Sequence, residues 1–98
     1  MRYLLLVYAA DGLAESAAPD EVLVSHELEP AWTATTVRVR AGETVLGDGP
    51  VAAAPEQLGR VDVLVAATLD EAIEVAARIL ETPEGLVEIR PLAQGVAA

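Results

Sequence analysis

The hydrophobic positions of this chain fall into two kinds of segment, and each kind predicts a different strand environment. Residues 2–8 are apolar at almost every position, which is typical of a strand whose two faces are both covered. Residues 21–28 and 35–40 instead alternate between apolar and polar side chains, as expected of strands with one wet face. Since residues 43–46 return directly after a short Ala-Gly turn, we predict a β-hairpin there.

The second half of the sequence predicts a strand, a helix and a last strand. Residues 61–67 and 86–91 have strand patterns, and Thr68 followed by Glu71 matches a capping box, in which each side chain satisfies a backbone amide at the start of a helix. One apolar stripe is expected on this helix, made of Leu69, Ile73, Ala76, Ala77 and Leu80.

Two weaker helical signals complete the list of elements. Residues 13–18 are compatible with a short helix that ends at Pro19, and residues 55–59 resemble one helical turn closed by a glycine. The order is therefore strand, short helix, strand, hairpin, strand, helix, strand.

This order predicts an α+β fold of the ferredoxin-like type, with a mainly antiparallel sheet, one strong helix and a shortened first helix. We expect residues 1–98 to form a single domain, because no repeat, linker or low-complexity tract divides them. One strong helix covers only part of one sheet face. We therefore predict a homodimer in which a second subunit covers the other face.

Composition excludes several classes of function. The formal net charge of −10 repels phosphate backbones and anionic headgroups, so neither nucleic acid nor a membrane surface is an expected partner. The chain contains no cysteine and one histidine, which argues against thiolate chemistry and against a zinc-thiolate or multi-histidine metal site within one chain. No Gly-rich phosphate loop or dinucleotide motif is present either, so no cofactor is expected. Absence of disulfides suits a cytoplasmic location. The longest apolar run, residues 3–10, is too short to cross a bilayer, although it also resembles the apolar part of a signal peptide.

Several segments, taken together, resemble one known family. They are Met1 to Tyr8, Thr35 to Arg40 followed by Gly42, Asp48-Gly49-Pro50, Glu56 to Gly59, Leu69 to Ala72 and Val87 to Pro91. In this order they resemble the YCII-related proteins, in particular the branch named for an Asp-Gly-Pro-Phe motif, here with Val51 as the fourth residue. The resemblance implies a dimeric α/β barrel, in which the sheets of two ferredoxin-like subunits form a common core.

The resemblance does not carry a catalytic pair to this chain. In relatives for which acid–base chemistry is proposed, a histidine in the first helix works with an aspartate. The corresponding region of this sequence contains no histidine.

Two residues are candidate acid–base groups, each with a plainer alternative. His26 is the single imidazole and shares a predicted strand face with Val22, Val24 and Leu28. It is either a general acid or base beside a cleft or a partly buried histidine bonded to the backbone. Asp48 is either a carboxylate at the mouth of a pocket or the side chain that stabilises a Gly-rich turn.

Four further residues are candidate ligand contacts: Arg38, Arg40, Arg90 and Trp32. A guanidinium can bond a carboxylate twice, so the arginines suit a small anionic ligand, and the indole suits an aromatic one. The alternatives are solvated cross-strand ion pairs and ordinary packing.

Two functions follow as hypotheses. The first is a dimeric small-molecule-binding or accessory module without strong catalytic apparatus. The second is a small lyase or isomerase that acts on a ring-type organic acid, with His26 as proton shuttle and Asp48 or Arg38 assisting.

Overall fold

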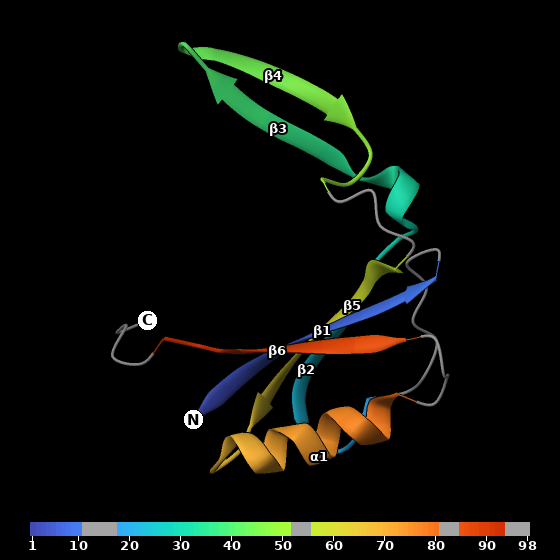
Figure 1. Cartoon of the computed structure of the whole chain (residues 1–98), viewed down its shortest axis with the longest axis vertical. Helices are drawn as coiled ribbons and strands as arrows, with labels where there is room; N and C mark the ends of the chain where they lie inside the picture. The colour runs from blue at the N-terminus through green and yellow to red at the C-terminus, as the bar shows by residue number, and fades with distance from the viewer. Residues whose placement is uncertain (11–17, 52–55, 81–84, 94–98) are drawn as a thin grey trace.

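A four-stranded antiparallel sheet forms the body of the protein (Figure 1). The computed structural model describes residues 1–10, 18–51, 56–80 and 85–93. In spatial order the strands are β2 (Val22–Glu27), β5 (Glu56–Val65), β1 (Arg2–Ala10) and β6 (Leu86–Pro91). The central place of β1 between β5 and β6 confirms the prediction from its continuous apolar run. The strand order and the one α-helix found among the described residues confirm an α+β fold and are consistent with a ferredoxin-like arrangement.

Helix α1 (Leu69–Ile79) covers one face of this sheet (Figure 1). Its predicted start is confirmed, since the Thr68 hydroxyl accepts a 3.2 Å hydrogen bond from the amide of Glu71. The Glu71 carboxylate, however, accepts from the amide of Ala67 at 2.9 Å and not from that of Thr68. No helix of the described residues is long and apolar enough to span a membrane.

The predicted apolar stripe of the helix is confirmed at Ala76 and wrong at its other four positions. The buried residues are Ala72, Val75, Ala76 and Ile79, whereas Leu69 and Ile73 are half exposed. Both sets are spaced three or four residues apart, so periodicity alone could not choose between them. The observed set contains the smaller side chains, which allow the helix to approach the sheet closely.

The hydrophobic core lies between α1 and this face of the sheet. Tyr3, Leu5 and Val7 of β1 form one cluster with Leu64 of β5 and with three residues of α1, which are Ala72, Val75 and Ile79. Leu5 is fully buried, while its neighbours Leu4 and Leu6, which point to the other face, remain partly exposed. Burial is therefore set by which face of the sheet a residue occupies.

A separate hairpin projects from the body on the side of the sheet opposite α1 (Figure 1). Strands β3 (Thr35–Arg40) and β4 (Glu43–Asp48) pair only with each other in the described structure. Ala41 and Gly42 connect them with positive φ angles of 50° and 79°, as the favoured two-residue hairpin turn requires. The predicted hairpin is confirmed, and we call residues 35–48 the arm.

Two local predictions are not confirmed: one is wrong, and the other lies mainly outside the described residues. The predicted helical turn at 55–59 is wrong, because residues 56–59 are extended in β5. Their pairing with β1 continues the sheet and satisfies their backbone groups. The predicted short first helix falls mainly on residues 11–17, outside the described residues.

Candidate functional site

The face of the sheet opposite α1, here called the open face, carries exposed apolar side chains. Leu4 and Leu6 of β1 pair with residues of β5, Val63 and Val61, and all four are partly exposed. At the flanks, Val24 is 45% exposed and Leu86 42%. The sequence predicted such an uncovered face, and the structure provides it.

A β-bulge decides which residues of β2 reach this face. Val22 pairs with Leu64 but Val24 pairs with Val63, so Leu23 is an extra residue and the register shifts there. Val22 consequently packs against the core, while Val24 and His26 lie on the open face. The predicted common face for Val22 and His26 is therefore wrong, because strict alternation does not anticipate a bulge.

His26 stands at one end of a row that crosses the open face. It lies opposite Val61, Val61 lies opposite Leu6, and Leu6 lies opposite Glu88. Three strand spacings of about 4.8 Å place His26 roughly 14 Å from Glu88. The imidazole is exposed and makes no hydrogen bond or ion pair with another described residue.

The other end of the row is polar. The Tyr8 hydroxyl donates to Glu88 Oε1 at 3.2 Å, and a guanidinium nitrogen of Arg90 lies 3.4 Å from Glu88 Oε2. Partial burial raises the pKa of the Tyr8 phenol, and the hydrogen bond to the Glu88 carboxylate and its negative charge raise it further, while the nearby Arg90 charge lowers it. Arg90 was a predicted site residue, whereas Tyr8 was not, because it lies within the apolar run of β1.

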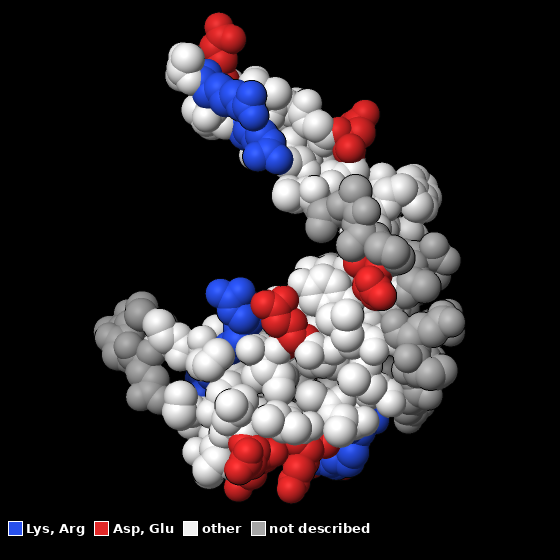
Figure 2. All heavy atoms as spheres, viewed as in Figure 1, with Lys and Arg blue, Asp and Glu red and all other residues white. Residues whose placement is uncertain are grey.

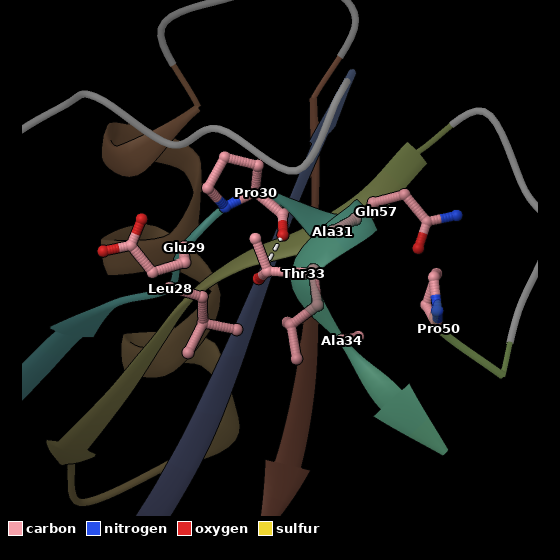
Figure 3. Close-up of a pocket in the computed structure, with 9 residues that line it drawn as sticks. Leu28, Glu29, Pro30, Ala31, Thr33, Ala34, Pro50 and Gln57 are labelled. Carbon is pink, nitrogen blue, oxygen red and sulfur yellow. Dashed lines mark hydrogen bonds between the residues drawn. The ribbon is translucent and has the colours of Figure 1, made fainter. Parts of the chain in front are cut away.

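A pocket of about 330 Å³ lies where the arm joins the body (Figure 3). Its lining is largely apolar and includes Leu28, Pro30, Pro50 and Leu58. The Thr33 hydroxyl within it already donates to the carbonyl of Pro30 at 2.7 Å. Figure 3 shows the Glu29 carboxylate turned away from Thr33 and Leu28. No arginine lines the pocket among the described residues.

The residues selected from the sequence are spread over several elements. Trp32 lies on η1 (Ala31–Thr33) at the root of the arm and is 79% exposed, whereas its two neighbours line the pocket. Asp48 ends β4 and is exposed, opposite Thr35. The others are His26 and Arg90 on the open face and Arg38 and Arg40 on the arm. Within the described residues, no hydrogen bond or ion pair joins any two of these six.

Comparison with known protein families shows the family to which this chain belongs. Residues 1–94 match the model of the YCII-related domain. The chain belongs to the YCII-related family. A similar protein is an uncharacterised protein of Rhizobium meliloti (strain 1021), which is 41% identical over 68 residues. The match covers 67% of this chain and 55% of that protein, so the chain spans little more than half of its relative's length.

In this YCII-related domain, the Asp48-Gly49-Pro50 segment forms the root of the arm. Gly49 has a φ of 93°, which a residue with a side chain rarely adopts. Its amide donates to the carbonyl of Ala34 at 2.7 Å, and its carbonyl accepts from the Thr36 hydroxyl at 2.8 Å. Pro50 then lines the pocket. The Gly-rich turn expected at this segment is present, while membership of the Asp-Gly-Pro-Phe branch stays a prediction.

A buried charged group on the helix-covered face was not selected from the sequence. Asp62 is completely buried and accepts from the Ser25 hydroxyl at 2.6 Å. Arg60, 1% exposed, places one guanidinium nitrogen 3.1 Å from Asp62 Oδ2. Opposite charges two residues apart in a strand share one face, so the spacing of Arg60 and Asp62 could have indicated this pair from the sequence. Because the group lies on the opposite face from the pocket and His26, we assign it to the stability of the YCII-related fold.

Proposed function

We propose that this YCII-related domain is a homodimeric module that binds a small molecule in the pocket at the root of the arm. The observation that carries the proposal is the pocket itself, a largely apolar volume of about 330 Å³ beside an exposed apolar sheet face. Small-molecule sites are typically concave and mostly apolar, of about 300–1,000 Å³, with few polar groups. A small aromatic compound suits this lining best.

The open face supports the proposed homodimer. Half-exposed Val24 and Leu86 flank a centre of leucine and valine side chains, which gain free energy when water is excluded. Two copies that bring their open faces together form the barrel-like core expected from the family resemblance. No arginine of the described residues lines the pocket within one copy, so an anionic group on the ligand would have to meet an arginine of the second copy, such as its Arg38.

A ligand screen by thermal shift tests the binding site. Ala34→Leu fills the pocket, and Ala77→Leu makes the same change on the exposed side of α1 as a matched control. We expect neutral aromatic compounds and aromatic carboxylates to include ligands that raise the melting temperature of the wild type and of Ala77→Leu. A ligand at 100 times its Kd adds about 2.7 kcal/mol of stability.

In Ala34→Leu the same ligands should cause no shift, although the free variant retains the wild-type circular dichroism spectrum. Equal shifts in Ala34→Leu and Ala77→Leu would place the binding site elsewhere. A panel without any ligand for the wild type would contradict the binding function.

The exposure of His26 supports a second candidate function. Its imidazole lies on the open face without a hydrogen-bond partner among the described residues, so it is available to a bound molecule. A lyase or isomerase acting on a ring-type organic acid would use it as proton shuttle. His26→Ala in the same screen separates the two candidates. Unchanged shifts for every ligand would remove His26 from the site.

A further inference from the structure

The arm overhangs the open face, and a hollow separates the two (Figure 2). Figure 2 shows the arginine side chains of the arm on the side that borders this hollow. In the register of the hairpin, Arg38 lies opposite Val45 and Arg40 lies opposite Glu43, so these four residues share the inner face of the arm. The outer face carries Val37, Val39 and Leu46.

The arm has little support from its own body. In the described part of the chain, the hydrogen bonds of Gly49 to Ala34 and Thr36 tie its root, and beyond the root its backbone hydrogen bonds are those between β3 and β4. Val37 is 60% exposed on one face and Val45 45% on the other. An isolated two-stranded hairpin is marginally stable in water. The arm therefore needs a second surface to hold it in one position.

The distribution of charge along the chain indicates which surface holds the arm. Residues 35–48 contain two arginines and two acids and are neutral overall, whereas the remaining four arginines and fourteen acids carry the whole net charge of −10. The bodies of two copies consequently repel each other. Contact between the inner face of one arm and the body of the other copy brings Arg38 and Arg40 close to a body whose net charge is −10.

We propose that the body of a second copy occupies the hollow and that the arm clasps it through its inner face. This inference rests on the proposed homodimer and adds the segment that holds it together. In a two-fold dimer the contact is made twice, because each arm clasps the body of the other copy. Arg38 and Arg40 then approach the binding region of the partner, and the site between the two copies is completed by both chains.

Charge reversal on the inner face tests the clasp. Sedimentation velocity over a concentration series measures the dimer Kd of the wild type and of Arg38→Glu/Arg40→Glu. We expect the reversal to raise the dimer Kd about tenfold at low salt, because charges at the rim of the interface that attract each other in the wild type repel each other in the variant. The difference from the wild type should shrink as salt screens the charges. The milder Arg38→Gln/Arg40→Gln variant should weaken the dimer less.

The outer face supplies the matched control. Val37→Ser/Leu46→Ser changes two exposed residues of the same hairpin on the other side, and we expect its dimer Kd to equal that of the wild type. If the reversal variant has the same dimer Kd as the wild type, the clasp is overturned but the homodimer is not. The same conclusion follows if Val37→Ser/Leu46→Ser causes the dimer to dissociate. A wild type that is monomeric at 50 µM would overturn the proposed homodimer and the clasp together.

Discussion

The two faces of the central sheet are built from similar strands but differ in how completely one chain covers them. On the helix-covered face, Leu5 and Leu64 are at most 1% exposed. On the open face, their neighbours Leu4, Leu6 and Val63 remain partly in contact with water. Adjacent residues of equal hydrophobicity are therefore buried to different extents, according to whether a helix of the same chain lies above them.

The polar groups follow the same division. The helix-covered face encloses a carboxylate–guanidinium pair with distances near 3.1 Å, formed by Asp62 and Arg60. The open face carries the more exposed pair Glu88 and Arg90 at 3.4 Å. We infer that the first face stabilises the domain and that the second is available for a ligand and a second copy.

Removal of one carboxylate from each face should affect stability very differently. Asp62→Ala leaves the Arg60 guanidinium buried beside an empty position, and we expect a loss of about 3–5 kcal/mol in the free energy of unfolding. Glu88→Ala breaks an exposed pair and should change stability by less than about 1 kcal/mol. Urea unfolding measures both. Similar losses for the two variants would show that the faces are not energetically distinct.

Much of this division was predictable from the sequence. The continuous apolar run of residues 2–8 predicted a central strand, and the Thr68–Glu71 spacing predicted the start of the helix. The pattern could not rank two equally periodic stripes on α1, so it assigned Leu69 and Ile73 to the core although they are half exposed.

The candidate site was less predictable, because it depends on contacts between distant segments. A one-residue bulge at Leu23 separated Val22 from His26, and no alternation rule anticipates such an insertion. The pocket forms where Leu28 and Pro30 meet Leu58 across the root of the arm. The sequence marked this root through Asp48-Gly49-Pro50, but it did not indicate that a cavity lies beside it.

A smaller effect concerns the electrostatics of the open face. Because the pKa of Tyr8 is raised above 10.0 in the folded chain, its neutral phenol is favoured there. The stability gained in this way is present below the unfolded pKa and is lost as pH rises through the folded value. We expect Glu88→Gln to lower the pKa of Tyr8 and Arg90→Gln to raise it.

Titration of the tyrosine ring carbons by NMR measures this pKa, and Tyr8→Phe assigns the signal. A Tyr8 pKa below 10, or one that the Glu88 substitution does not change, would contradict the described contact.

Sedimentation equilibrium of Leu6→Arg beside the wild type tests whether a second copy covers the open face. Leu6 lies at the centre of the open face and points away from the core, so an arginine there should leave the monomer folded. We expect the wild type to be dimeric at micromolar concentration and Leu6→Arg to be folded and monomeric. A monomeric wild type, or a variant that dimerises as tightly as the wild type, would contradict this expectation.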